Sequence, residues 1–218
     1  MSSQMSYDPD TYWQTRGGEA YREYTLNPAY QIYREAQDAF IAGLVARVAP
    51  HSLLDFACGT GKLFPHWIDV PEVDAYDRAL SQIEVARREA ARVRPERPYR
   101  VMHCLTDSRT ELLYDDGQFD LVVAAEVLLH VLPEDIGALL SELKRVCRGC
   151  LAIITAAPFD NPAAHCFNHD YTTLLEGHFL ITDDFARHRQ RYIVARPVRP
   201  HPEKSHAMEA MPDAVIAS

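Results

Sequence analysis

Two acidic residues and a glycine-rich turn are the part of this sequence best suited to chemistry. Asp55 ends the hydrophobic stretch LLDF, and the turn that follows contains Gly59 and Gly61. A turn of this kind usually holds a pyrophosphate at the start of a helix. A carboxylate in that position would repel a pyrophosphate and would favour an ammonium or sulfonium group. We therefore expect a ligand that carries a positive charge near Asp55.

A second acid, Asp77, ends the next hydrophobic stretch, VDAYD. An acid at the end of a second strand is placed to accept hydrogen bonds from both hydroxyl groups of a ribose. A ligand with a ribose, a cationic centre and no pyrophosphate points to S-adenosylmethionine. Asp55, which would repel a pyrophosphate, also argues against a nicotinamide-dependent oxidoreductase.

The hydrophobic pattern indicates which elements would position these acids. A short helix is expected around PDTYWQTR, ended by Gly17 and Gly18. Asn27 and Pro28 then mark the start of a long helix that ends before Pro50. Short apolar stretches then alternate with helical ones, which predicts strands at SLLDFA, VDAY, YRVMHC, FDLVVAA and CLAIITAA. Such alternation indicates a parallel sheet that is covered by helices on both faces and binds ligands at the carboxyl ends of its strands.

The end of the chain follows a different pattern. HFLITDDFARHRQRYIVARP predicts two antiparallel strands, and the preceding helix in PEDIGALLSELKRVCRG is expected to close at Gly149. The expected fold is therefore an α/β, Rossmann-like, doubly wound and mostly parallel seven-stranded sheet with an antiparallel C-terminal edge hairpin. We divide this single domain into a small N-terminal helical lid (1–49), a core (50–196) and a loosely ordered tail (197–218).

Four segments carry a family resemblance. LLDFACGTGK, VDAYDRALSQIEVAR, the region around LTD and GQFDLVVAAEVLLHVLPED resemble, in order and spacing, the signature segments of class I S-adenosylmethionine-dependent methyltransferases. The resemblance covers residues 50–156 and implies S-adenosyl-L-methionine as the cofactor and S-adenosyl-L-homocysteine as the product. It implies cofactor contacts at Asp55, Ala57, Cys58, Gly59 and Gly61, at Asp77 and Arg78 beside the ribose, at Thr106 and Asp107 beside the adenine, and at Glu126 next to the acceptor.

The methyl acceptor is expected to be a small molecule. The net charge of −9 argues against a nucleic-acid partner, which needs clustered basic residues. Arg187 and Arg189 lie in a basic stretch near the end, and cations of this kind suit a carboxylate, phosphate or phosphonate whose oxygen needs no base. Stand-alone relatives in bacterial secondary metabolism methylate oxygens, so we expect O-methylation of a small acidic metabolite. Further polar groups for this acceptor are offered by Tyr24, Tyr30, His165 and Tyr171.

Several alternatives stay open from the sequence alone. If the acceptor is a neutral phenol or amine, His130 or His169 would act as the general base. A histidine in the position of His130 is more often a packed residue than a base. Trp13 and Arg16 precede the core and would close over the cofactor, with Arg16 paired to its carboxylate or simply solvated. A non-catalytic, methyltransferase-like subunit is the remaining alternative.

The cysteine content and the apolar pattern indicate the cellular location of the protein. Its five scattered cysteines, including the pair Cys147 and Cys150, favour neither a disulfide framework nor a metal site. The sequence shows neither a signal-peptide pattern nor the roughly 20 consecutive apolar residues that span a bilayer. We expect a cytoplasmic protein without membrane partners, and either a monomer or a homodimer.

Overall fold

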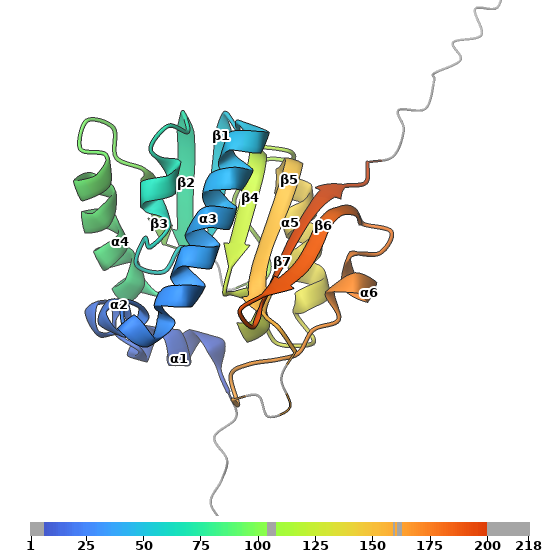
Figure 1. The fold of residues 1–218 in the computed structure, drawn as a ribbon, viewed down its shortest axis with the longest axis horizontal. Coiled ribbons are helices and arrows are strands. Elements are labelled where there is room, and N and C mark those ends of the chain that lie inside the picture. Colours follow the sequence, from blue (N-terminus) through green and yellow to red (C-terminus); the bar gives the residue numbers. More distant parts are fainter. Residues whose placement is uncertain (1–6, 104–107, 159, 161–162, 200–218) are drawn as a thin grey trace, which may run out of the picture.

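The computed structural model describes residues 7–103, 108–158, 160 and 163–199 (Figure 1). These residues form a seven-stranded sheet in the order β3-β2-β1-β4-β5-β7-β6. Strands β1 to β5 are parallel, whereas β7 runs antiparallel to both β5 and β6. The predicted doubly wound fold with an antiparallel edge hairpin is confirmed. The strands are β1 (Ser52–Phe56), β2 (Glu72–Asp77), β3 (Arg100–His103), β4 (Phe119–Ala125), β5 (Cys147–Ala156), β6 (Phe179–Arg187) and β7 (Gln190–Pro197).

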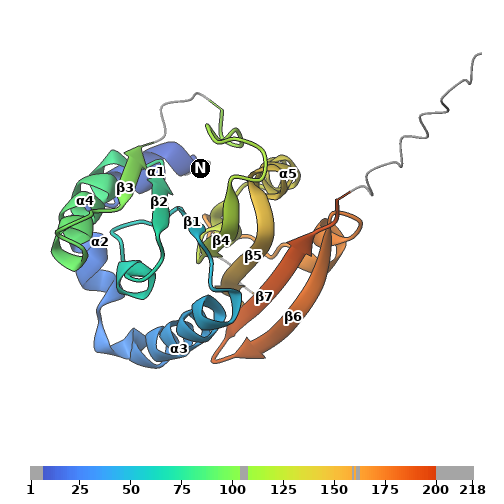
Figure 2. The same ribbon diagram turned by 90° about the horizontal axis from the view of Figure 1, so that it is seen from above.

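Helices cover both faces of the sheet (Figure 2). Buried side chains of α3 (Gln31–Val48), α4 (Leu80–Val93) and the short helix η2 (Phe64–Trp67) pack on one face. Those of α5 (Ile136–Val146) and α6 (Tyr171–Leu175) pack on the other. The two hydrophobic clusters hold β1, β2 and β4 rigidly, so the loops at the ends of these strands have fixed starting points.

The N-terminal segment, which was predicted to be a helical lid, contains helices. Helices α1 (Pro9–Thr15) and α2 (Gly18–Thr25) lie beside the end of the sheet to which β4 points (Figure 1). The predicted start of the next helix is present, since Asn27 Oδ1 accepts a hydrogen bond from Ala29 N (2.9 Å) at the short helix η1 (Pro28–Tyr30) that leads into α3. The sequence analysis did not predict α2.

Two glycines begin or end elements differently from the sequence-based expectation. Gly18 begins α2 instead of ending a helix, and a Cβ there would lie 2.1 Å from the carbonyl oxygen of Ser81 on α4. Helix α5 ends at Val146 and the chain enters β5 directly, so Gly149 is a strand residue. A Cβ on Gly149 would lie 2.2 Å from the Asp120 carbonyl oxygen. In both places close backbone approach, not helix capping, requires glycine.

Cys147 and Cys150 lie buried in β5, at 0% and 7% exposure, and are free thiols that fill the core. Within the described ranges, no helix has both the length and the apolar character needed to cross a membrane.

Candidate active site

A cavity of about 200 Å³ lies at the carboxyl ends of β1, β2 and β4, where the strand order reverses. Its walls come from the turn after β1, the end of β2, the loop after β4 and the lid helices α1 and α2. Parallel strands deliver these segments to one edge of the sheet, as ligand sites of this fold require. The sequence-predicted residues that line it are Trp13, Asp55, Ala57, Cys58, Gly59, Asp77, Arg78, Glu126 and His130.

The turn after β1 has the left-handed backbone that its small residues predict. Ala57, Gly59 and Gly61 have φ angles of 57°, 55° and 80°. A Cβ on Gly59 would meet no atom within 4 Å, whereas one on Gly61 would lie 2.6 Å from the ring of Phe64. Gly59 therefore keeps the cavity wall open, and Gly61 is outside the cavity lining and allows the turn to pack on Phe64.

Asp55 is a buried carboxylate with little to balance its charge. Its side chain is 2% exposed and accepts one hydrogen bond, from Trp67 Nε1 (2.9 Å). Burial raises the pKa of Asp55 to about 7, and the Trp67 hydrogen bond offsets only part of this effect. Within the described part of the chain, no cationic side chain lies within 4.0 Å of it. The cavity thus has a wall that favours a cationic ligand.

Asp77 is held rigidly at the end of β2. Its Oδ2 accepts a hydrogen bond from Gly59 N (2.9 Å), and its Oδ1 accepts one from Ala79 N (2.8 Å). Burial raises the pKa of Asp77, and these backbone hydrogen bonds act in the opposite direction. Each oxygen keeps acceptor capacity, so the fixed carboxylate can receive two neighbouring hydroxyl groups.

Gln82 is a polar cavity residue that the sequence analysis missed. It lies on α4, is 2% exposed and lines the cavity. Neither its Nε2 nor its Oε1 has a hydrogen-bond partner among the described residues. Leaving such a group without a partner costs roughly 1–3 kcal/mol. A ribose-bearing ligand would supply the missing partners, and the only signal in the sequence was a glutamine on the buried face of a helix.

We expect Gln82→Met to change stability and affinity in opposite directions. Removal of the buried amide should leave the free energy of unfolding of the ligand-free protein unchanged or raise it by about 1 kcal/mol. Loss of hydrogen bonds to the ligand should weaken S-adenosylhomocysteine binding by about 3- to 10-fold. Urea unfolding and calorimetric titration measure the two quantities. A less stable variant with unchanged affinity would show that Gln82 serves only packing.

His130 follows β4 in the short helix η3 (Leu128–His130) and lines the cavity. Its Nδ1 donates a hydrogen bond to the His165 carbonyl oxygen (2.7 Å), and its ring lies edge-on to Trp13, with ring centres 4.9 Å apart. Burial lowers the pKa of His130 to about 4, so the ring is neutral at pH 7. With the proton on Nδ1, Nε2 is left as a hydrogen-bond acceptor.

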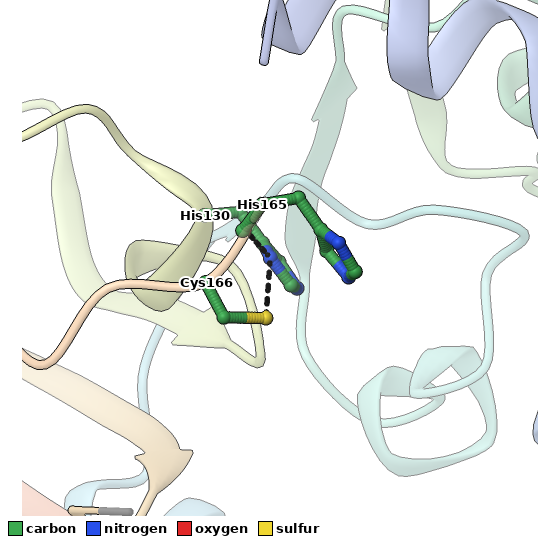
Figure 3. A group of neighbouring side chains, drawn as sticks. All are labelled: His130, His165 and Cys166. Atoms are coloured by element: carbon green, nitrogen blue, oxygen red, sulfur yellow. Dashed lines mark hydrogen bonds between the residues drawn. The ribbon is translucent and has the colours of Figure 1, made fainter. Parts of the chain in front are cut away.

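Figure 3 shows His130 beside His165 and Cys166. These side chains are of types that bind zinc, and Cys166 Sγ lies 3.6 Å from His130 Nδ1. However, this same Nδ1 gives its proton to a carbonyl group, and the two imidazole rings stack at 5.3 Å and 19° instead of converging. The cluster therefore anchors the His130 ring.

Arg16, Tyr24, Tyr30 and His165 lie outside the cavity lining. Arg16 lies over the ring of Tyr12 (5.1 Å) and near that of Tyr24 (5.9 Å). Tyr24 and Tyr30 share a hydrogen bond between their hydroxyl groups (2.7 Å). His165 stacks on Tyr12 at 4.6 Å. These contacts hold the lid segment together, and the predicted ligand roles of Arg16, Tyr24, Tyr30 and His165 have no support from cavity lining.

Two other predicted site residues, His169 and Tyr171, make contacts within the protein outside the cavity. His169 Nε2 donates a hydrogen bond to the Val131 carbonyl oxygen (3.0 Å), and Tyr171 is buried with its hydroxyl 3.4 Å from Thr155 Oγ1. Neither lines the cavity. Of the two predicted bases, His130 lines the cavity and His169 does not.

The turn between β6 and β7 reaches the same edge of the sheet as the cavity. The Arg189 carbonyl oxygen accepts a hydrogen bond from Ala157 N (2.8 Å), and Gln190 Nε2 donates to Glu126 Oε1 (2.8 Å). The side chains of Arg187 and Arg189 are exposed and do not line the cavity. The turn that carries them therefore lies at the rim of the cavity, with both side chains in solvent. Thr106 and Asp107, the predicted adenine contacts, lie outside the described residues.

Residues 53–149 match a family model described as a methyltransferase domain. Residues 53–149 are a methyltransferase domain, and the sheet has the class I methyltransferase fold. The family resemblance inferred from the four sequence segments is thus confirmed. S-adenosylmethionine is the cofactor of this family, and the cavity residues Asp55, Asp77 and Gln82 fit its cationic and ribose groups.

A curated protein is similar in sequence to part of this chain. A malonyl-[acyl-carrier protein] O-methyltransferase from Pseudescherichia vulneris is 31% identical over 138 residues, which cover 62% of this chain and 50% of that protein. The chain thus spans about half the length of this curated relative.

Solved structures share the fold. Magnesium protoporphyrin IX methyltransferase from Synechocystis PCC 6803 with bound S-adenosylmethionine aligns with a TM-score of 0.69 and 19% identity over 90% of this chain and 100% of that one. The PH0226 protein from Pyrococcus horikoshii OT3 aligns with a TM-score of 0.65 and 18% identity over 81% and 99%. At these identities the similarity shows the fold alone.

Proposed function

We propose that this protein transfers a methyl group from S-adenosylmethionine to an oxygen atom of a small acidic metabolite. The observation that carries the proposal is the cavity at the strand-order reversal. It joins a buried carboxylate that favours a cation, Asp55, to a rigid carboxylate that can receive a ribose diol, Asp77. A pyrophosphate-bearing dinucleotide would be repelled at Asp55.

In this reaction the protein mainly positions the cofactor and the acceptor and excludes water. When bound, the cofactor supplies a methyl group on a sulfonium centre. Asp77 and Gln82 would fix the nucleoside, and Asp55 would favour the positive charge. Trp13 and Tyr21 of the lid helices line the cavity and would keep solvent out. Alignment of the acceptor and a dry site are the two contributions that a methyltransferase makes without a covalent intermediate.

An acid is favoured as acceptor by two observations. The name of the relative from Pseudescherichia vulneris describes O-methylation of a malonyl group, which carries a free carboxylate. Lys62 lines the cavity, and Arg187 and Arg189 lie at its rim, so an anion meets positive charge on the way in. An ionised oxygen is already a nucleophile and needs no base.

His130 supports a second candidate, methylation of a neutral phenol or amine. Its neutral ring lines the cavity and leaves Nε2 free to accept a proton from such an acceptor. Turnover of radiolabelled S-adenosylmethionine on a panel of small carboxylates, phosphates, phosphonates, phenols and amines separates the two. We expect methyl esters from the acids; products from phenols or amines alone would replace the first proposal with the second.

The double substitution Arg187→Ala with Arg189→Ala should raise the KM of an acidic acceptor by about 3- to 10-fold. Each exposed charge contributes roughly 0.2–1 kcal/mol, and the two side chains act together at the rim. The affinity for S-adenosylhomocysteine should stay the same because neither side chain lines the cavity. Added salt should reduce the difference from the wild type. An unchanged KM at low salt would show that the rim cations do not recruit the acceptor.

A further inference from the structure

Lys62 is a cation in the cavity wall without an ionic partner. It directly follows Gly61, is half-buried, and lines the cavity. Its Nζ donates one hydrogen bond, to Gln37 Oε1 (2.5 Å). In the described ranges, no carboxylate oxygen lies within 4.0 Å of this ammonium group. An ammonium group has three donors, so two remain available to a ligand.

A chain of buried polar groups fixes this ammonium group. Tyr192 Oη donates to Gln190 Oε1 (2.8 Å), and Gln190 Nε2 donates to Glu126 Oε1 (2.8 Å). Gln37 Nε2 also lies 3.4 Å from Glu126 Oε1, which turns the Gln37 carbonyl oxygen toward Lys62. The side chains come from β7, the loop after β4, α3 and the turn after β1. Side chains from three other elements thus hold the cation of this turn at the cavity.

The Gln37 side chain, which accepts the hydrogen bond from Lys62, does not neutralise the charge of Lys62. An amide oxygen accepts a hydrogen bond but carries no net charge, whereas a carboxylate at the Gln37 position would form an ion pair. Burial lowers the pKa of Lys62, while the nearby Glu126 acts in the opposite direction. A ligand anion would therefore gain a charge-assisted hydrogen bond and would relieve the cost of the half-buried cation.

We propose that Lys62 is a carboxylate-binding residue of the cavity and that Gln37, Glu126 and Gln190 position it. The proposal rests on the proposed function. The carboxylate belongs either to the amino-acid part of the cofactor or to the acidic acceptor. Asp55 and Lys62 line the same cavity with opposite charges, a pattern complementary to a ligand with both an ammonium and a carboxylate group.

Calorimetric titration of Lys62→Met separates the two sources. The ligands are S-adenosylhomocysteine and 5′-methylthioadenosine, which keeps the nucleoside but lacks the amino-acid part. Malonate and its neutral analogue malonamide are then tested by thermal shift with S-adenosylhomocysteine bound. Lys144→Met on α5 is the matched control, because it removes the same charge far from the cavity lining. Lys62→Arg tests whether charge alone is sufficient.

We expect Lys62→Met to weaken binding of one carboxylate ligand by about 10- to 100-fold, as for a hydrogen bond to a charged group. A loss for S-adenosylhomocysteine with none for 5′-methylthioadenosine assigns the cofactor carboxylate. Loss of malonate stabilisation alone assigns the acceptor. Equal effects on all ligands, or none on any, would overturn the role of Lys62. If the wild type does not bind S-adenosylhomocysteine, the proposed function fails and the Lys62 assignment fails with it.

Discussion

Replacing Asp77 with alanine is expected to weaken S-adenosylhomocysteine binding by about 10- to 150-fold, or roughly 1.5–3 kcal/mol, the usual loss for hydrogen bonds to a charged acceptor. The carboxylate is fixed by two backbone N–H groups, so no other side chain can take its place without moving the turn. Isothermal titration calorimetry at pH 7.5 measures the change.

Glu72→Ala is the matched control for Asp77→Ala. Glu72 begins the same strand and is exposed at its opposite end, so its loss removes one acid from β2 without touching the cavity. The control should bind like the wild type. An Asp77→Ala variant that unfolds normally and keeps wild-type affinity would remove the ribose assignment.

Asp55→Asn should abolish a large pH dependence of stability in the ligand-free protein. The folded pKa of Asp55 is about 7, above its ordinary value of 3.8. The native state therefore binds this proton more tightly than the unfolded state, and the free energy of unfolding falls as the pH rises from about 4 to about 7. Three pKa units correspond to at most about 4 kcal/mol.

The difference in the free energy of unfolding between the wild type and Asp55→Asn reports the titration of Asp55, because the other titrating groups are present in both proteins. Urea unfolding is measured at intervals from pH 4.5 to pH 8. The free energy of unfolding of the variant should increase relative to that of the wild type as the pH rises, with a plateau above about pH 7. The Trp67 indole can donate equally to the asparagine oxygen, so packing is preserved. A difference that does not vary with pH would mean that Asp55 is not held in its protonated form by burial.

The positions of the two acids could be predicted because they depend on local patterns. Asp55 and Asp77 each end an apolar strand, and the parallel sheet places such ends together whatever the rest of the chain does. Glu126 followed from the family resemblance, and Trp13 from its position just before the core. The fold was predictable because each strand and each core helix carries its own periodicity.

Other features depend on contacts between distant segments. The ammonium group of Lys62 is held through Gln37 and Glu126, which lie on α3 and after β4, and no local pattern connects them. Gln82 has no hydrogen-bond partner among the described residues, a feature that no sequence pattern indicates. Charge alone suggested Arg187 and Arg189 as ligand contacts, but a hairpin turn places their side chains in solvent. Tyr171 was a plausible donor by type and is a core residue by position.

Titration of S-adenosylhomocysteine into the ligand-free protein at pH 6.5, in two buffers of different ionisation enthalpy, tests the central claim most directly. At this pH much of Asp55 is protonated, because its pKa is about 7. A cationic ammonium group bound beside it should lower that pKa and release a proton. We predict binding with net proton release, and loss of the release in Asp55→Asn. Absence of S-adenosylhomocysteine binding, or binding without proton release, would contradict the claim that Asp55 receives the positive charge of the cofactor.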